Sequence, residues 1–143
     1  MPYALKNGTL APVIALNLWT LIMEGWMYAT RLPAIRQHNI PMNPDATPNE
    51  FGAKFPPSVR WKADNYNHLH EQPTAFYAVA LSLAHIGADD KVSVGLAWTY
   101  VGLRVIHSLV QSLSNRIPLR FSVFATSSCV LAALTIKAAT LVF

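Results

Sequence analysis

Four stretches of the chain are dominated by hydrophobic residues and contain almost no charge. They cover residues 7–30, 71–88, 92–115 and 121–143, and polar or proline-containing segments separate them. The hydrocarbon core of a membrane is about 30 Å thick and needs roughly 20 apolar residues for one helical crossing. Since each stretch is close to this length, the pattern predicts an all-α integral membrane protein, a bundle of four helices that each cross the bilayer.

Turn and cap signals set the expected bounds of these elements. We predict helices at about residues 7–31, 58–87, 90–115 and 117–143, all in a single membrane domain that spans residues 1–143. The segment at about residues 32–57 is predicted to be a cytoplasmic loop, because prolines and turn-forming residues are concentrated in and around it. Six of the ten prolines of the chain lie between residues 31 and 60, namely Pro33, Pro41, Pro44, Pro48, Pro56 and Pro57.

Composition supports a membrane protein and argues against several other classes. Of the 143 residues 52% are hydrophobic and 13% are charged, whereas soluble domains contain roughly 25% charged residues. The net charge of +4 comes without a basic cluster beside exposed aromatic residues, so we predict no nucleic-acid partner. The single cysteine, Cys129, excludes an internal disulfide, and the histidines show no metal-ligand spacing, so no metal site is predicted.

Basic residues are distributed unequally between the two predicted sides of the membrane. The first and third connections, with the helix ends beside them, hold Arg31, Arg36, Lys54, Arg60, Lys62, Arg116 and Arg120, and the opposite side holds Lys6 and Lys91. Loops rich in lysine and arginine stay on the cytoplasmic side. Both termini are therefore predicted to lie on the non-cytoplasmic side, and the first helix is expected to stay in the mature protein, because its apolar run is longer than that of a signal peptide.

The third stretch contains a stripe of polar side chains. Tyr100, Arg104, His107 and Gln111 are four, three and four residues apart, which places them on one face of a helix. Ionisable groups inside a membrane cost a few kcal/mol each on insertion scales, so they usually face other helices and often have a functional role. We expect this stripe to face the inside of the bundle.

A matching stripe precedes the second stretch. Arg60, Asp64, Asn67 and Glu71 have the same spacing, and Pro73 then predicts a local kink because it removes a backbone donor. If the two stripes meet, Arg104 and Glu71 neutralise each other and the remaining groups surround a polar cleft that opens toward the cytoplasm. The alternative is that this pair merely locks two helices together, since buried ion pairs alone are weak evidence of function.

Two segments of the chain resemble the MAPEG family, the membrane-associated proteins in eicosanoid and glutathione metabolism. They are "NHLHEQPTAFYA" and "WTYVGLRVIHSLVQSLSNRIPLR", and the resemblance covers residues 61–122. Its most specific part is the Arg-x-x-His pair at Arg104 and His107, with Arg120 thirteen residues later. A bacterial-type member of this family is expected in the bacterial inner membrane.

The resemblance implies a homotrimer that holds glutathione between neighbouring subunits near the cytoplasmic surface. By position it implies that Asn67, Glu71, Arg104 and His107 contact the co-substrate and that Arg31 or Arg36 reaches one of its carboxylates. The Gln111 amide is a further candidate, because it suits the peptide groups of glutathione. Arg120 takes the position of the arginine beside the thiol, and Ser122 is a candidate hydroxyl for the same thiol. A free thiol has a pKa of about 8.5, and a nearby guanidinium favours its nucleophilic thiolate form.

Three functions remain open at this point. The first is a glutathione-dependent transferase or peroxidase that acts on hydrophobic electrophiles, small molecules that enter from the membrane lipids. The second is a non-catalytic, lipid-binding or accessory subunit of the same family, which is favoured by Gln111 and Phe124 at positions where catalytic members carry hydroxyl groups. The third is a small proton- or ion-coupled transporter, but the ionisable residues gather toward one side and leave no continuous path across the membrane.

Overall fold

The computed structural model describes residues 8–143, and this part of the chain contains helices and no strand. The helices are α1 (Leu10–Gln37), α2 (Pro48–Ala53), α3 (Pro57–His68), α4 (Pro73–His85), α5 (Lys91–Leu113) and α6 (Ile117–Val142). The all-α class is therefore confirmed. The expected helix start near residue 7, and Lys6, which entered the count of basic residues, lie outside the described residues.

Prolines and short polar side chains begin several of these helices. Proline occupies a first-turn position of α2, α3, α4 and α6, where its missing N–H costs no helical hydrogen bond. At α2, Thr47 Oγ1 accepts from the Glu50 N–H and Glu50 Oε2 accepts from the Thr47 N–H, which forms a capping box. At α5, the Asp90 carboxylate accepts from the first free N–H groups.

The first two helical segments differ in extent from the expected ranges. α1 continues to Gln37 rather than ending near residue 31, because Ala34 in its last turns is buried against Ile40 and Phe55. The segment expected at 58–87 consists of two helices, α3 and α4, with a break at residues 69–72. Pro73 has no N–H to continue the ladder of hydrogen bonds across this break, so the helix is interrupted at the position where a kink was expected.

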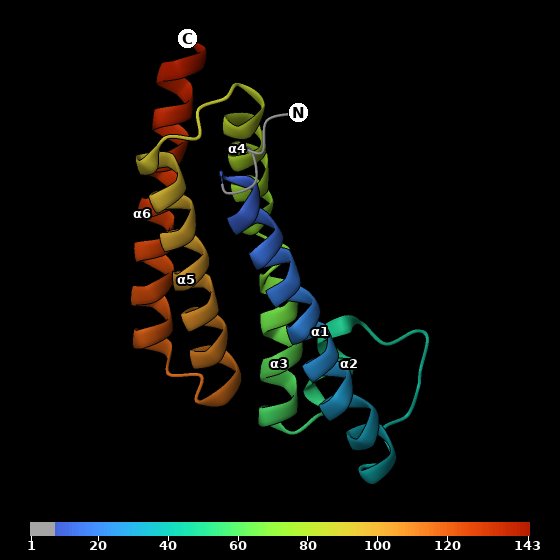
Figure 1. Ribbon diagram of the computed structural model, residues 1–143. Coiled ribbons are helices and arrows are strands. Elements are labelled where there is room, and N and C mark those ends of the chain that lie inside the picture. Colours follow the sequence, from blue (N-terminus) through green and yellow to red (C-terminus); the bar gives the residue numbers. More distant parts are fainter. Residues whose placement is uncertain (1–7) are drawn as a thin grey trace.

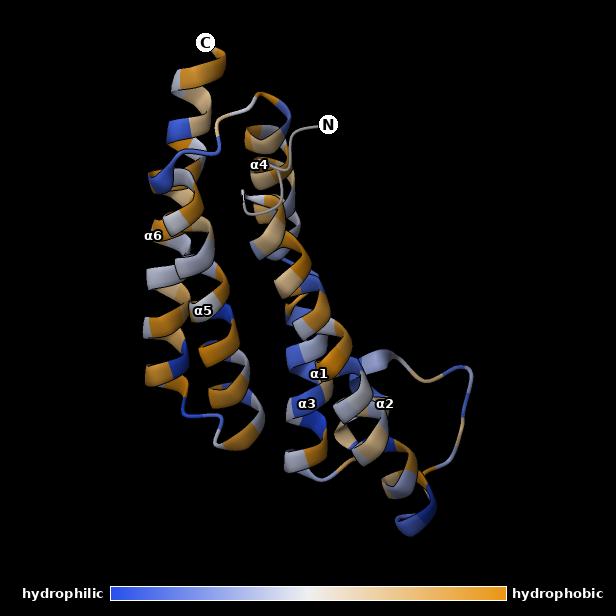
Figure 2. Cartoon of the chain, viewed as in Figure 1, coloured by the Kyte–Doolittle hydropathy of each residue, from blue (hydrophilic) through white to orange (hydrophobic). Residues whose placement is uncertain are grey.

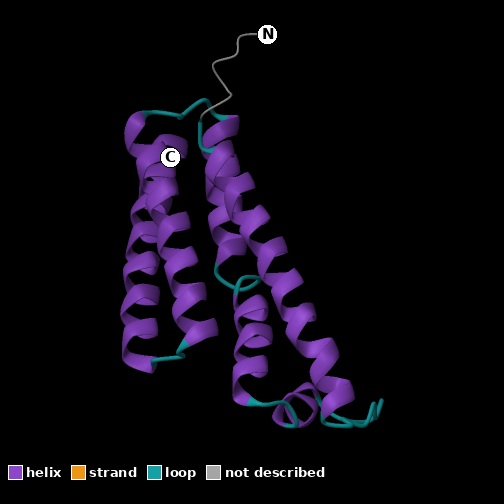
Figure 3. Cartoon of the chain, turned by 60° about the horizontal axis from the view of Figure 1, so that its bottom comes forward, coloured by secondary structure: helices purple, strands orange, loops and turns teal. Residues whose placement is uncertain are grey.

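Two groups of long helices pack side by side. α5 and α6 form an antiparallel pair, and α1 packs against α3, α4 and α5, while α4 follows α3 along nearly the same line (Figures 1 and 3). The α4–α5 connection lies at one end together with the start of α1 and the end of α6. The polar segment with α2 and the α5–α6 connection lie at the opposite end. The two connections rich in basic residues are therefore on the same side.

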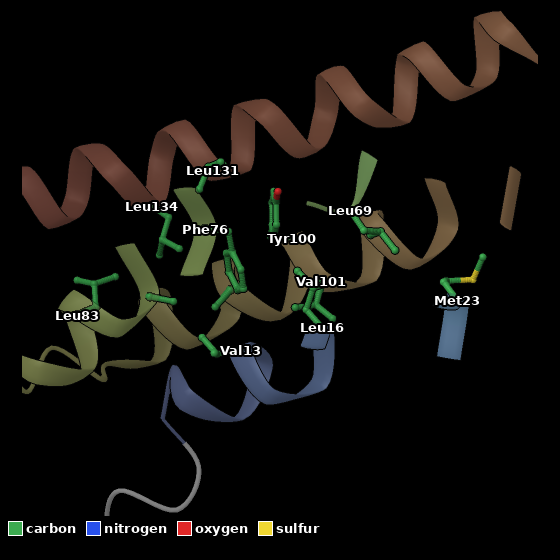
Figure 4. Packing of buried hydrophobic residues seen from close by; sticks show 12 residues of the cluster. Val13, Leu16, Met23, Leu69, Phe76, Leu83, Tyr100, Val101, Leu131 and Leu134 are labelled. Atoms are coloured by element: carbon green, nitrogen blue, oxygen red, sulfur yellow. The ribbon is translucent and has the colours of Figure 1, made fainter. Parts of the chain in front are cut away.

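Buried hydrophobic side chains from α1, α4, α5 and α6 form the core (Figure 4). Phe76 stacks on Tyr100 with ring centroids 4.5 Å apart and an interplanar angle of 19°. Leu16 approaches from α1 and Leu134 from α6, and both are fully buried. This packing fixes the rotation of α5 about its axis, so the residues of its polar stripe are buried as well.

Two of the described helices, α1 and α6, are long and apolar enough to cross a membrane by length and composition. Figure 2 shows the hydrophobic colour along both, with hydrophilic residues gathered on α3. α4 has only 13 residues, and the polar stripe of α5 interrupts its apolar sequence. The four crossings expected from the sequence therefore stay a prediction.

Candidate functional site

A polar cavity of about 470 Å³ lies between α3, α5 and the start of α6. It is on the side of the α5–α6 connection, and the two polar stripes both contribute to its wall. The residues that line it are Asp64, Asn67, His68, Glu71, His107, Gln111, Ile117, Arg120, Phe121 and Phe124. Five of the eight site residues proposed from the sequence are thus together, namely Asn67, Glu71, His107, Gln111 and Arg120.

Arg104 lies next to this cavity but does not line it. Its side chain is fully buried, and Nη2 donates to the carbonyl oxygen of His68 at 3.2 Å. This carbonyl belongs to the last residue of α3, where helix carbonyls lack a partner within the helix. The Arg104 guanidinium also lies 5.7 Å from the centroid of the Phe124 ring. Arg104 therefore ties the break between α3 and α4 to α5 and α6.

The ion pair expected between Arg104 and Glu71 is not formed in the described part of the chain. Glu71 Oε2 instead contacts His68 Nδ1 at 2.7 Å, and the Glu71 side chain is 66% exposed. Glu71 lies in the break after α3 and lines the cavity, whereas Arg104 is buried and does not line it. Glu71 therefore remains accessible to a ligand.

Three rings lie close together, at tilted angles, in the wall of the polar cavity. The His68 ring lies 4.9 Å from that of His107 and 5.3 Å from that of Phe124. His68 was not among the site residues predicted from the sequence. The sequence feature that could have identified His68 is its spacing of three residues from Glu71, since side chains three apart on a helix lie next to each other.

Four side-chain polar atoms of the α5 stripe are buried without a partner among the described residues, two on Arg104 and one each on His107 and Gln111. His107 Nδ1 and Gln111 Oε1 are buried and form no hydrogen bond with residues 8–143. Buried polar groups are almost always paired, because leaving one unpaired costs about 1–3 kcal/mol. Since both side chains line the polar cavity, a polar ligand there has two groups ready to bind it.

A hydrogen-bonded bridge below the cavity joins three helices. The Tyr100 hydroxyl donates to Gln72 Oε1 at 3.2 Å, and Gln72 Nε2 donates to Ser128 Oγ at 2.7 Å. Gln72 and Ser128 were not predicted from the sequence. The bridge connects α5, the start of α4 and α6, so it holds the elements that carry the cavity wall at a fixed distance from one another.

The connection between α5 and α6 positions Arg120. Asn115 has φ +48°, and its Oδ1 accepts a hydrogen bond from Arg120 Nη1 at 2.6 Å. Ser122, proposed as a second thiol-stabilising group, does not line the polar cavity. Its hydroxyl donates to the Pro118 carbonyl of its own helix at 2.9 Å.

Arg31, the remaining predicted residue, lines a separate cavity. This loop cavity has a volume of about 560 Å³ and lies between the segment with α2, the end of α1 and α3. It adjoins the polar cavity, since Asp64 and Asn67 line both. The structure therefore places Arg31 away from Arg120, in a neighbouring compartment.

Comparison with known proteins gives one result for nearly the whole chain. The model of the MAPEG family matches residues 9–140, which confirms the resemblance found in residues 61–122. Comparison with curated proteins and with solved structures found no match. The family match and the two apolar helices support a location in a membrane. By its match over almost its full length, the chain belongs to the MAPEG family.

Proposed function

We propose that this protein is a glutathione-dependent membrane transferase or peroxidase that acts on hydrophobic electrophiles. The MAPEG family contains such enzymes together with non-catalytic members. The observation that supports the proposal is the polar cavity, which is lined by Arg120 together with His107 and Gln111, two side chains that each have a buried polar atom without a partner.

The chemistry of the cavity wall fits glutathione. The tripeptide has an ammonium group, two carboxylates, two amides and a thiol. Glu71 offers an exposed carboxylate to the ammonium, Asn67 and Gln111 offer amides to the peptide groups, and a cavity of about 470 Å³ is within the usual range for small-molecule sites. Since Arg31 lies in the adjoining loop cavity, the proposed binding set consists of Asn67, Glu71, His107 and Gln111, with Arg104 as support.

Arg120 is the group proposed to act on the thiol. A bound glutathione supplies the sulfur nucleophile, and the guanidinium stabilises its thiolate form by charge and hydrogen bonding. Phe121 and Phe124 line the same cavity as Arg120 and supply apolar surface near the proposed thiol position. Asn115 keeps one guanidinium nitrogen fixed, so the others are free to point toward the sulfur.

The membrane arrangement proposed for this enzyme has four crossings. α1 and α6 provide two of them, and α5 with 23 residues is about 35 Å long at 1.5 Å per residue. α3 and α4 together form the remaining crossing. With the basic connections at one end, this arrangement puts both termini on the non-cytoplasmic side of a bacterial inner membrane. We further propose a homotrimer in which a neighbouring subunit covers the open side of the polar cavity.

A second function is favoured by one specific observation. Among the described residues, none of those that line the cavity with Arg120 carries a hydroxyl group, and the Ser122 hydroxyl donates to a carbonyl of its own helix. Such a site suits a non-catalytic family member that binds a lipid-like ligand. The two functions differ in whether a thiolate forms.

The test is a titration of the purified protein with glutathione, followed by the ultraviolet difference absorbance of the thiolate. Arg120→Ala is the test variant, and Arg116→Ala is the matched control, because Arg116 is exposed on the same helix start and does not line the cavity. We expect a saturable thiolate signal in wild type and Arg116→Ala and its loss in Arg120→Ala. Binding of glutathione without any thiolate signal in wild type, or no binding of glutathione at all, would refute the catalytic proposal and favour the non-catalytic, lipid-binding function.

A further inference from the structure

The loop cavity has ordered walls, although it is built from the proline-rich segment. Ala34, Ile40 and Phe55 form a small buried cluster, and Ile35, Phe51 and Val59 pack against it. This cluster attaches the segment to α1 and α3, while the capping box of Thr47 and Glu50 fixes the start of α2. The cavity is therefore part of the fold, and it adjoins the polar cavity of the proposed function, with which it shares Asp64 and Asn67.

The charges that line the loop cavity are unequal. Arg31 and Arg60 contribute two guanidinium groups, and Asp64 contributes the one carboxylate. Within residues 8–143 neither arginine forms an ion pair or donates a side-chain hydrogen bond. Asp64 also lines the polar cavity, where its carboxylate interacts electrostatically with Arg120 as well. The lining therefore has an excess of positive charge and free donors for an anion.

The position of Arg31 suits a flat ligand. Its guanidinium carbon lies 4.7 Å from the centroid of the Phe55 ring and 5.2 Å from that of the Phe51 ring. This stacking holds the guanidinium plane by a cation–π interaction and leaves its N–H edge available. Met42, Pro44 and Val59 supply further apolar wall. An anionic group next to an apolar, preferably aromatic, body matches both features.

The ligand reaches this cavity from water. Asn43, Pro48 and Asn49 line it and are exposed, and they belong to the polar segment rather than to the apolar faces of α1 and α6. A molecule that arrives from the bilayer instead meets the long helices first. We propose that the loop cavity is a second binding site, which takes soluble organic anions with a flat apolar body at Arg31 and Arg60.

The experiment measures binding of naphthalene-2-sulfonate to the full chain in nanodiscs of zwitterionic lipid, without glutathione, by calorimetry. Naphthalene-2-sulfonamide has the same ring and nearly the same shape but no charge. We expect saturable binding of the sulfonate and an affinity for the sulfonamide that is lower by at least about tenfold, because charged hydrogen bonds are much stronger than neutral ones. Hydrogen exchange is expected to slow within residues 42–55.

Variants assign the effect to the two arginines. Arg31→Gln and Arg60→Gln should each weaken sulfonate binding by about tenfold or more, whereas Lys54→Gln, which removes the same charge from an exposed side chain outside the cavity, should leave it unchanged. Arg31→Lys, which keeps the charge and the fold, should bind with intermediate affinity because lysine lacks the planar fork.

Four results would overturn the proposal. They are equal affinity for the neutral sulfonamide, an equal loss in Lys54→Gln, slowed exchange only outside residues 42–55, and no saturable binding. A further arm uses discs with phosphatidylglycerol at an ionic strength that screens surface charge. Unchanged sulfonate affinity there supports a soluble ligand, and competition by this lipid would assign the cavity to a lipid headgroup instead. Since none of these readouts involves glutathione, they are independent of the proposed function.

Discussion

The contact between Asn115 and Arg120 allows a sharp test of how the site is positioned. Asn115 has a left-handed backbone conformation, which glycine adopts without strain. Asn115→Gly therefore keeps the connection between α5 and α6 but removes the side chain that holds the Arg120 guanidinium at 2.6 Å. The substitution therefore tests whether the position of the Arg120 guanidinium matters, because Arg120 itself stays in place.

The size of the effect follows from the type of contact. A hydrogen bond to a charged group contributes roughly 1.5–3 kcal/mol. Arg120 is only half-buried, so solvent screening reduces this contribution to the lower end, about 1.4 kcal/mol, which corresponds to a factor of about ten in affinity. We expect Asn115→Gly to bind glutathione about tenfold more weakly, with a matching loss of thiolate signal at fixed glutathione concentration.

Asn115→Asp is the matched variant, because it keeps an oxygen acceptor at the same place. It should bind glutathione more strongly than Asn115→Gly, although its carboxylate offsets part of the guanidinium charge, and both variants should keep the melting temperature within the error of a circular dichroism measurement in the same micelles. The reasoning would be refuted if Asn115→Gly bound like wild type, or if Asn115→Asp lost as much affinity as Asn115→Gly.

Three further predictions concern the framework that carries the site. Tyr100→Phe removes the hydrogen bond to Gln72 Oε1 and should lower the free energy of unfolding in mixed micelles by about 1 kcal/mol; a cost near zero would contradict the proposed bridge. Phe76→Ala should cost about 3–5 kcal/mol, because this ring is fully buried and stacked on Tyr100, whereas Ile136→Ala on the exposed side of α6 should cost well under half as much; equal costs would show that the core lies elsewhere. Lys137 and Ser93 hold the pKa of Asp90 well below its usual range through hydrogen bonds to its carboxylate. A carboxylate whose pKa is lower in the folded than in the unfolded protein stabilises the fold at any pH above its unfolded pKa of about 3.9, and this stabilisation is lost as the pH falls toward the folded pKa. The melting temperature of wild type should therefore exceed that of Asp90→Asn at pH 7 and approach it below about pH 4. A constant difference in melting temperature across this range would contradict the assignment.

Much of the candidate site could be predicted from local spacing. Residues three and four apart on a helix share a face, so the stripes that contain Asn67, Glu71, His107 and Gln111 were visible in the sequence, and these side chains do line one cavity. Arg120 followed from the family motif rather than from spacing. The apolar runs likewise identified a helical membrane protein, because the length and composition of each run can be read without knowing which helices contact one another.

Other features depended on contacts between segments that are distant in the sequence. His68 joined the site because α3 ends where His107 and Phe124 pack against it, and Arg104 bonded to a backbone carbonyl rather than to Glu71 because the break before Pro73 turned that carboxylate outward. Arg31 was placed in a separate compartment by the packing of Phe51 and Phe55 against its guanidinium. Helical periodicity determines which residues share a face, but the rotation of each helix about its axis and the neighbour that this face meets are set by tertiary packing. For that reason the sequence by itself determined the composition of the polar stripes, and only the tertiary structure decided which of their members surround one cavity.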